Sequence, residues 1–141
     1  MKWLAASCFA LFSLIATPTL ASSSLVAKIN LSEQTMVVYV DGVQYYTWRV
    51  STARRGYRTP VGRYRPTFLK RMHYSSKYDN APMPYSIFFK GGYAIHGTDA
   101  LRSLGRPASH GCVRLHPSNA RELFQMVRYF GIKNSRIEVS H

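Results

Sequence analysis

The feature that most restricts the fold of this chain is a pair of β-forming runs on either side of Asp41-Gly42. Val26 to Leu31 alternates as a half-buried strand does, and Met36 to Val40 is a run of strand-forming residues. Val43 to Val50 is rich in Tyr, Thr and Trp. An Asp-Gly pair between two such runs is typical of a tight hairpin, because both residues accept positive φ. We therefore expect antiparallel sheet between residues 25 and 50.

Further extended segments follow, and they are not separated by repeating helices. These segments are Thr59–Tyr64, Tyr85–Phe89, Tyr93–Ile95 (after a Gly91-Gly92 turn and ending at His96) and Arg136–Val139. A chain with this order of elements folds as a mostly β domain with minor helix rather than as a doubly wound α/β sheet. We expect one domain over residues 25–140.

One long helix is predicted, in the C-terminal half of the chain. Ser118 is a good N-cap residue after Pro117, and Gly131 is the expected stop. The apolar side chains between them recur on one face at helical spacing, and they are Ala120, Leu123, Phe124, Val127 and Phe130.

Residues 1–21 have the pattern of a secretory signal peptide. Lys2 precedes an uncharged run from Trp3 to Ala16, Pro18 ends that run, and Thr19-Leu20-Ala21 offers small residues for cleavage after Ala21. The alternative is a retained N-terminal anchor, although a membrane-spanning helix needs roughly 20 apolar residues. We therefore expect an exported protein of the periplasm or cell envelope, without stable membrane insertion.

The remaining chain is strongly basic. Because Lys2 is the one charged residue before position 22, residues 22–141 carry 18 Lys and Arg against 6 Asp and Glu. Nine of the basic residues lie between Gly42 and Tyr78, where there is no acidic residue. Such a charge favours anionic partners, for example the carboxylates of an envelope polymer. A generically basic exported protein is the other interpretation.

Export leaves Cys112 as the sole thiol, and the residues around it suggest a nucleophile. Ser109-His110-Gly111-Cys112-Val113-Arg114 places a thiol, an imidazole and a guanidinium within six residues. A thiolate needs nearby positive charge and backbone N–H donors for the oxyanion that it creates. His96, at the end of a predicted strand and before Gly97, is suited to act as its base.

The sequence offers three alternatives to a cysteine nucleophile. His73, His96, His110, Cys112 and His116 are metal-ligand types, but their spacing fits neither CxxC pairs nor HExxH, so no metal is expected. A serine hydrolase lacks its G-x-S-x-G elbow. A non-enzymatic module for nucleic acid or an envelope polymer stays open, because the aromatic residues Trp48, Tyr57, Tyr64, Phe68 and Tyr74 interleave with the basic ones.

The sequence resembles the L,D-transpeptidase catalytic domain, the YkuD family, whose signature is His-Gly upstream of Ser/Thr-His-Gly-Cys. Here those residues are His96-Gly97 and Ser109 to Cys112. The likeness extends over nearly all of residues 25–139, including Thr59-Pro60-Val61-Gly62. The resemblance implies a β-sandwich-like fold and acyl transfer without a cofactor.

The resemblance also implies catalytic roles. Cys112 is then the acylated nucleophile and His96 its base, oriented by the carbonyl of Gly97. His110 and the amides of Gly111 and Cys112 would line the oxyanion and substrate pocket.

Other residues receive substrate-binding roles by the same resemblance. Ser109 would support the catalytic loop, and Arg114 would hold the loop or a substrate carboxylate. Residues Arg71 to Pro84 would form a lid-like segment whose side chains touch substrate, namely Tyr74, His73 and Met83; an ordinary surface loop is the alternative.

The implied substrate is a peptidoglycan tetrapeptide stem, cleaved between the L-centre of meso-diaminopimelate and the following D-Ala. The acceptor is then a second stem, giving a 3→3 cross-link, or an amine of an envelope protein. Water as acceptor would make the enzyme a carboxypeptidase or amidase with the same nucleophile. Nucleic acid is not an expected partner, because the predicted signal peptide places the chain outside the cytoplasm.

Overall fold

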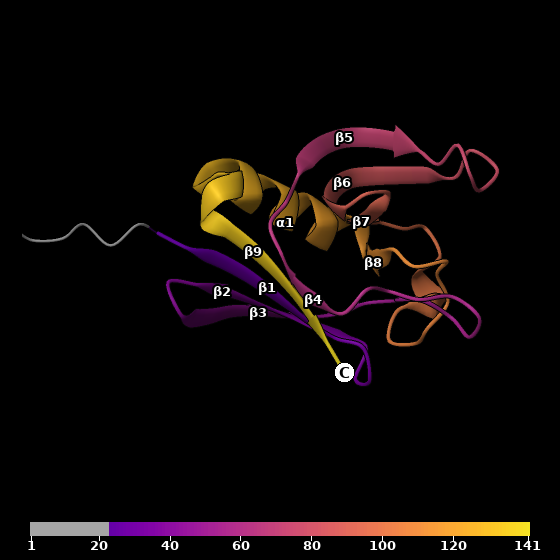
Figure 1. Ribbon diagram of the computed structural model, residues 1–141, viewed down its shortest axis with the longest axis horizontal. Coiled ribbons are helices and arrows are strands. Elements are labelled where there is room, and N and C mark those ends of the chain that lie inside the picture. Colours follow the sequence, from indigo (N-terminus) through magenta and orange to yellow (C-terminus); the bar gives the residue numbers. More distant parts are fainter. Residues whose placement is uncertain (1–22) are drawn as a thin grey trace, which may run out of the picture.

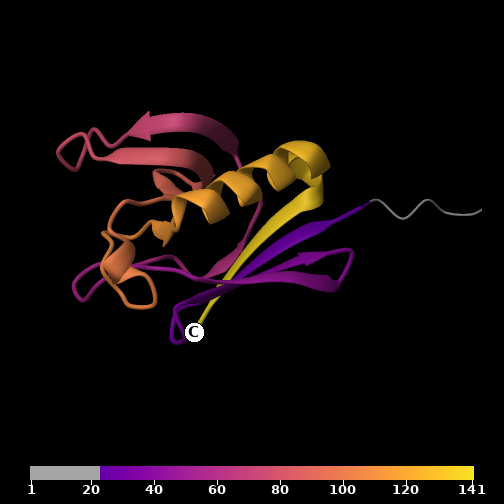
Figure 2. The same cartoon turned by 180° about the vertical axis from the view of Figure 1, so that it is seen from behind.

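The computed structural model describes residues 23–141, which form two β-sheets and one long helix (Figures 1 and 2). The fold is mostly β with its helix in the C-terminal half, as the sequence predicts. The predicted signal peptide, residues 1–21, lies outside the described residues.

The first sheet has five strands in the order β3-β2-β1-β9-β4. Its strands are β1 (Leu25–Asn30), β2 (Thr35–Val40), β3 (Val43–Arg49), β4 (Gly62–Tyr64) and β9 (Ser135–Ser140). The predicted hairpin joins β2 to β3, with Val40 opposite Val43 and with φ of 50° at Asp41 and 79° at Gly42. These angles are those of the tight turn that matches strand twist.

The second sheet has four strands in the order β5-β6-β7-β8. Its strands are β5 (Phe68–Tyr74), β6 (Pro82–Lys90), β7 (Tyr93–Gly97) and β8 (Val113–Leu115). Two pairings join strands distant in sequence and run parallel: β1 with β9 in the first sheet, and β7 with β8 in the second. The parallel β7–β8 pair is the part of the fold that determines the site described below.

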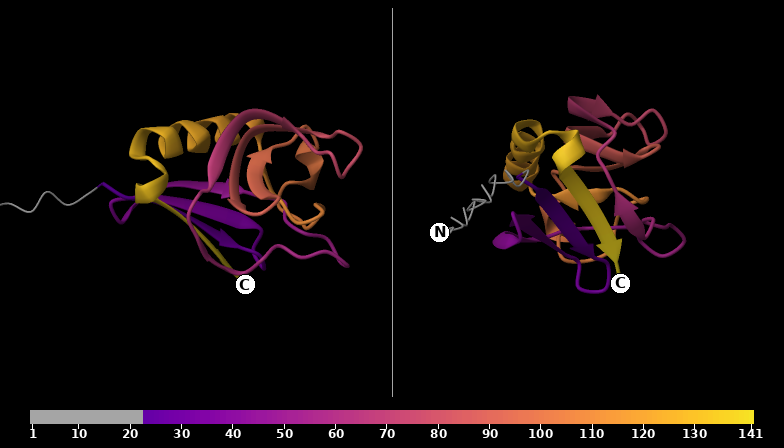
Figure 3. Two further views of the ribbon diagram at one scale, coloured as in Figure 1. Left: turned by 45° about the horizontal axis from the view of Figure 1, so that its top comes forward. Right: turned by 60° about the vertical axis from the view of Figure 1, so that its left-hand side comes forward.

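One hydrophobic core lies between the sheets and α1 (Pro117–Phe130), which packs on β6 and β7 (Figures 1 and 3). Alternate residues of β1 enter this core, and the helix contributes the buried face predicted from its spacing: Ala120, Leu123, Phe124 and Val127. Gly131, with φ of 84°, ends the helix as predicted.

The N-cap of α1 differs from the prediction. His116 is the cap, Pro117 is the first helical residue, and the amide of Ser118 donates to His116 Nδ1 at 3.2 Å. Proline suits this first position because its missing N–H would have no partner inside the helix. Ser118 is therefore inside the helix, where its hydroxyl still hydrogen-bonds His116 Nδ1 at 2.7 Å.

The segment predicted as a loop between residues 71 and 84 is largely a hairpin. β5, which the sequence analysis missed, pairs with β6, and a short turn at residues 75–81 joins them. Tyr85 in β6 has φ of 54°, which shifts the alternation of that strand. Tyr85 thus packs on the main core, while Met83 and Phe88 both join a second small cluster on the opposite face of the sheet.

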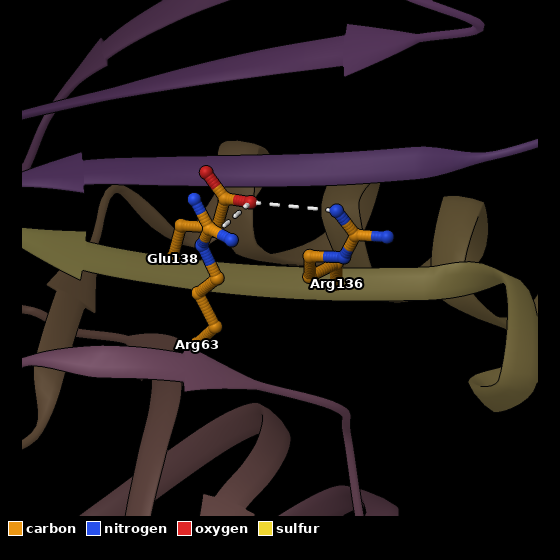
Figure 4. A network of polar contacts seen from close by, with 3 residues as sticks. All are labelled: Arg63, Arg136 and Glu138. Carbon is orange, nitrogen blue, oxygen red and sulfur yellow. Dashed lines mark ion pairs between the residues drawn. The ribbon is translucent and has the colours of Figure 1, made fainter.

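The outer face of the first sheet carries a small charge network. Glu138 of β9 lies 3.9 Å from Arg63 of β4 and 3.6 Å from Arg136, measured between side-chain nitrogen and oxygen (Figure 4). Both arginine side chains are exposed, so solvent screens these pairs and each contributes at most about 1 kcal/mol. Arg63 therefore lies on this sheet face and not with the basic residues of the site.

Candidate functional site

The parallel pairing of β7 with β8 brings His96 and Cys112 to one face of the second sheet. His96 is opposite Arg114 in the register, and Ile95 is opposite Val113. Because side chains alternate along a strand, Ile95 and Val113 enter the core while His96 and Arg114 face the other way. Cys112 directly precedes β8 and shares their face, where it packs against the small apolar cluster of Met83, Phe88 and Ala94.

This face forms the floor of a cavity of about 840 Å³. His96, Cys112 and Arg114 line it from the sheet, and the turn of the β5–β6 hairpin closes one side with Tyr78. A segment containing Tyr57 forms another wall. The volume lies within the range of about 300–1,000 Å³ that small-molecule sites occupy.

His96 is buried, with 6% of its surface exposed, and its tautomer follows from one hydrogen bond. Its Nδ1 lies 2.7 Å from the carbonyl oxygen of Gly97. A carbonyl only accepts, so Nδ1 carries the proton and Nε2 is left with the free lone pair. Burial lowers the pKa of His96 to about 4, with Arg114 and His73 adding to the effect and the Gly97 hydrogen bond opposing it. At neutral pH this imidazole is an uncharged proton acceptor.

Cys112 is half-buried, and its thiol lies 3.8 Å from the carbonyl oxygen of Gly92. Burial raises the pKa of the Cys112 thiol, whereas the backbone of Ala94 and the charge of Arg114 lower it. The sequence-based expectation that neighbouring positive charge would depress this pKa is therefore outweighed by desolvation. The site holds a neutral thiol and a neutral imidazole, an arrangement that suits proton transfer during attack rather than a standing thiolate.

Hydrogen bonds hold the loop before Cys112 in shape. The Ser109 hydroxyl donates to the Cys112 carbonyl at 2.6 Å and accepts from the Gly111 amide at 3.0 Å. The buried hydroxyl of Thr59 donates to the Gly111 carbonyl at 2.8 Å. Of the two amides expected to face an oxyanion, that of Gly111 already has a partner in Ser109, which leaves the amide of Cys112 as the candidate.

Gly111 is required for a reason that the sequence did not reveal. Its φ is 139°, and a Cβ there would lie 2.6 Å from the Tyr93 ring and 2.9 Å from the Arg58 carbonyl oxygen. The space that a side chain would need at Gly111 is therefore already filled by protein atoms. Gly97 is also tightly packed, because a Cβ would lie 3.2 Å from the Pro117 backbone.

His110 lies in a stack of side chains from three segments. Its ring is parallel to that of Tyr78 at 4.0 Å between centroids and edge-on to Tyr57 at 4.8 Å. Arg54 Nη2 lies 3.1 Å from His110 Nε2, and since a guanidinium only donates, that nitrogen accepts. Burial lowers the pKa of His110, with Arg54 as the next cause, which keeps the stacked ring neutral.

Comparison with known proteins identifies the domain. The sequence profile described as the L,D-transpeptidase catalytic domain, YkuD, matches residues 24–139. The chain belongs to the YkuD family. It is 43% identical over 49 residues to the probable L,D-transpeptidase YbiS of Escherichia coli K12, a match that covers 35% of this chain and 16% of that protein.

Solved structures of YkuD-family and other L,D-transpeptidases have the same fold. An L,D-transpeptidase from Stackebrandtia nassauensis aligns with a TM-score of 0.74 and 28% identity, over 86% of this chain and 57% of that one. L,D-transpeptidase 3 from Mycobacterium tuberculosis, in complex with a faropenem-derived adduct, aligns with a TM-score of 0.73 and 23% identity, over 84% of this chain and 61% of that one. The chain thus spans about three-fifths of these structures.

The YkuD domain brings most of the predicted site residues into the lining of one cavity. Met83, Ser109, His110 and Arg114 line it together with Cys112 and His96, whereas Gly97, Gly111 and the exposed Tyr74 do not. Tyr74 follows His73 on β5, and neighbouring side chains of a strand point to opposite faces. The lining residues that the sequence analysis did not single out include Tyr78, Tyr93 and Asp99, which carry no local motif. Tyr57 was named there only among the aromatic residues, and Arg58 was counted only among the basic ones.

The nine basic residues between positions 42 and 78 do not form one surface in this YkuD domain. Arg58 and Lys77 line the cavity, Arg54 binds His110, and Arg63 lies on the outer face of the first sheet. Several interleaved aromatic rings pack within the chain instead of forming an open stacking platform: Trp48 on Tyr46, Tyr64 on Phe89 and Phe68 on Phe88.

No helix among residues 23–141 has the length and hydropathy needed to cross a membrane. Nor do three or more His, Cys, Asp or Glu residues of that range gather where they could hold a metal ion.

Proposed function

We propose that this protein is an exported cysteine L,D-transpeptidase that acts on peptidoglycan tetrapeptide stems through a Cys112 thioester. The observation that carries the proposal is the pairing of Cys112 with His96 in one cavity, with His96 Nε2 free to take a proton. Membership of the YkuD family supports the same chemistry. No metal or cofactor has a part in it.

In the first half-reaction, Cys112 Sγ attacks the carbonyl carbon between the L-centre of meso-diaminopimelate and D-Ala. The thiol proton passes to His96 Nε2 as the C–S bond forms, and the amide of Cys112 is the donor we assign to the oxyanion. Collapse of the tetrahedral intermediate breaks the C–N bond. His96 then returns the proton to the leaving nitrogen, so that D-Ala departs and the thioester remains.

In the second half-reaction, an amine attacks the thioester and passes a proton through His96 to the departing thiol. A second stem peptide as acceptor gives a 3→3 cross-link, and an amine of an envelope protein gives wall attachment. Water as acceptor gives an L,D-carboxypeptidase with the same nucleophile. We place the reaction in the periplasm or cell envelope, because residues 1–21 have the signal-peptide pattern and the substrate is there.

The remaining site residues support this chemistry without taking part in bond making. Ser109 and Gly111 shape the nucleophile loop, Gly97 fixes the His96 tautomer, and His110 and Met83 form cavity walls against which the stem lies. Tyr74 is excluded from this set by its position outside the lining.

The test is to incubate the purified protein with tetrapeptide stem fragments and to measure mass adducts on Cys112 together with D-Ala release. We expect a thioester on Cys112, none in Cys112→Ala, and strongly slowed formation in His96→Ala. His116→Ala is the control of matching residue type, since His116 caps α1 outside the cavity. Absence of any adduct on Cys112 would refute the enzymatic proposal.

The acceptor is identified separately, by analysing muropeptides after incubation with whole sacculi. New 3→3 dimers indicate transpeptidation, tripeptides alone indicate hydrolysis, and a bound protein indicates attachment. By analogy with the faropenem-derived adduct of the Mycobacterium tuberculosis enzyme, a carbapenem or penem should also acylate Cys112. Acylation by penicillin alone would count against the assignment.

A further inference from the structure

We propose that His73 takes a proton from the ammonium group of the acyl acceptor in the second half-reaction. This inference rests on the proposed function and adds a second base to it. Three observations support it: the number of protons that aminolysis moves, the place of His73 in the cavity, and the hydrogen bonds that occupy the other imidazoles there.

Aminolysis of a thioester moves one proton more than the proposed route through His96 accounts for. A primary amine is mostly an ammonium ion at neutral pH, and its nitrogen then has no lone pair with which to attack. The nitrogen must lose one proton before the C–N bond forms and a second proton before the amide is complete. The second proton passes through His96 Nε2 to the departing thiol. The first proton therefore needs another acceptor.

His96 is poorly placed to take both protons. Its Nδ1 is held by the Gly97 carbonyl, so Nε2 is its one accepting nitrogen. Only 6% of its surface is exposed, and burial lowers its pKa to about 4. An imidazolium formed here by the first proton would be enclosed away from solvent, and it could not accept the second proton.

His73 is half-buried and lies on the same face of the second sheet. It is opposite Met83 in the β5–β6 register, and its ring stands edge-on to Phe88 at 5.2 Å between centroids. Met83 and Phe88 belong to the small apolar cluster against which Cys112 packs. His73 also lines the cavity, and its charge helps to lower the pKa of His96. The thiol and the His73 ring therefore flank one apolar cluster on the cavity floor.

The hydrogen bonds of the cavity leave His73 able to accept a proton. Among the described residues, no hydrogen bond joins a ring nitrogen of His73 to another residue, so the neutral ring keeps a free lone pair. His110 Nε2, by contrast, already accepts from Arg54 at 3.1 Å. Asp79 and Asp99 also line the cavity and attract cations, but a carboxylate is a much weaker base than an imidazole.

The step is balanced in protons and electrons. One N–H bond of the ammonium breaks, its proton bonds to the His73 ring, and the electron pair left on nitrogen forms the bond to the thioester carbon. Collapse of the tetrahedral intermediate breaks the C–S bond, and the second amine proton reaches the sulfur through His96. The His73 imidazolium then releases its proton to water, so both imidazoles are neutral again.

The experiment uses the tetrapeptide stem as donor and compares two acceptors. One is a tripeptide stem, which ends before D-Ala and carries a side-chain amine that is protonated at neutral pH. The other is hydroxylamine, which is mostly uncharged there. In His73→Gln, kcat/KM for the tripeptide should fall about 100-fold further than kcat/KM for hydroxylamine, the range of general base catalysis. His116→Gln, outside the cavity, is the control of matching residue type and should keep the ratio.

A pH profile tests the same step in the unmodified protein, even where His73→Gln fails to fold. If His73 keeps the proton in the cavity, the ratio of kcat/KM for tripeptide to that for hydroxylamine should stay nearly constant between about pH 7.5 and 9. In His73→Gln the ratio should rise about tenfold per pH unit, because only the free amine attacks. The charged groups of the lining are the same in both proteins and cannot cause a difference in slope: Arg58, Lys77, Asp79, Asp99 and Arg114.

A tenfold rise of the ratio per pH unit in the unmodified protein overturns the role of His73 and leaves the thioester chemistry standing. Equal losses for both acceptors in His73→Gln overturn it as well, since they indicate a merely structural effect. So does a thioester on Cys112 that reacts with water and yields no amide with the tripeptide. No thioester on Cys112 from the donor refutes the proposed function itself.

Discussion

Lowering the pH from 7 to 4 should destabilise this protein in a way that His96 specifically controls. In the folded state burial lowers the pKa of His96 to about 4, against 6.5 for an ordinary histidine. Between these two pH values His96 is protonated in the unfolded chain but not in the folded chain, so the free energy of unfolding falls as the pH falls. The difference of about 2.5 pKa units corresponds to a loss of about 3 kcal/mol between pH 7 and pH 4.

The assay is urea denaturation of the unmodified protein and of His96→Gln at pH 7, 6, 5 and 4. Glutamine does not titrate, and its amide can still donate toward the Gly97 carbonyl. The difference in free energy of unfolding between the two proteins should therefore shrink by about 3 kcal/mol over this range, while groups common to both cancel. NMR titration of the His96 ring gives an independent value, which we expect near 4.

Two results would contradict this prediction: a difference between the two proteins that stays constant within about 0.5 kcal/mol, or a His96 ring that titrates near 6.5. Either result would mean that His96 is solvated in solution and not enclosed by the sheet. The same shift should appear in catalysis, because His96 must be neutral to accept the thiol proton. We expect the acid limb of kcat/KM for acylation near pH 4.

Three more outcomes follow from packing and stacking. Gly111→Ala should be severely destabilising, by more than about 3 kcal/mol in denaturant melts, because its Cβ would lie 2.6 Å from the Tyr93 ring at positive φ; a loss below about 1 kcal/mol would contradict this. His110→Phe should preserve KM within about threefold, because a phenyl ring keeps the 4.0 Å stack on Tyr78. His110→Ala, which removes the ring, should raise KM about tenfold. Equal effects of the two substitutions on KM would mean that stacking is irrelevant. Leu123→Ala should cost about 2–5 kcal/mol by opening a cavity in the core, and a wild-type melting curve would show that α1 is not packed as described.

Local signals in the sequence predicted the elements that depend on neighbouring residues. The turn at Asp41-Gly42 needs two positive φ angles, and the helix needs apolar residues at one spacing; both signals are complete within a short window. β5 escaped prediction because its side chains are mostly exposed and its apolar and charged residues do not alternate. The N-cap was misplaced by two residues because Ser and a histidine followed by proline can both begin a helix.

The candidate site was also predicted only where its features depend on neighbouring residues in the sequence. The local motif identified His96, Gly97 and the Ser109 to Cys112 loop, because a family signature is itself a local pattern. It did not predict that burial would dominate the pKa of Cys112, that the Gly111 amide would be occupied, or that Tyr74 would point away from the cavity. Those properties depend on which distant segments pack around each group.

By itself, the amino-acid sequence determined the β-rich class, the position of the helix and the residue types available for chemistry. Dihedral preference and side-chain periodicity act over a few residues and need no other part of the chain. Only the tertiary structure decided that β7 and β8 pair in parallel, which places His96 beside Arg114 and sets both in one cavity with Cys112. Solvation and pKa depend on distances in space between residues far apart in sequence, and those distances exist only once the two sheets have closed on their core.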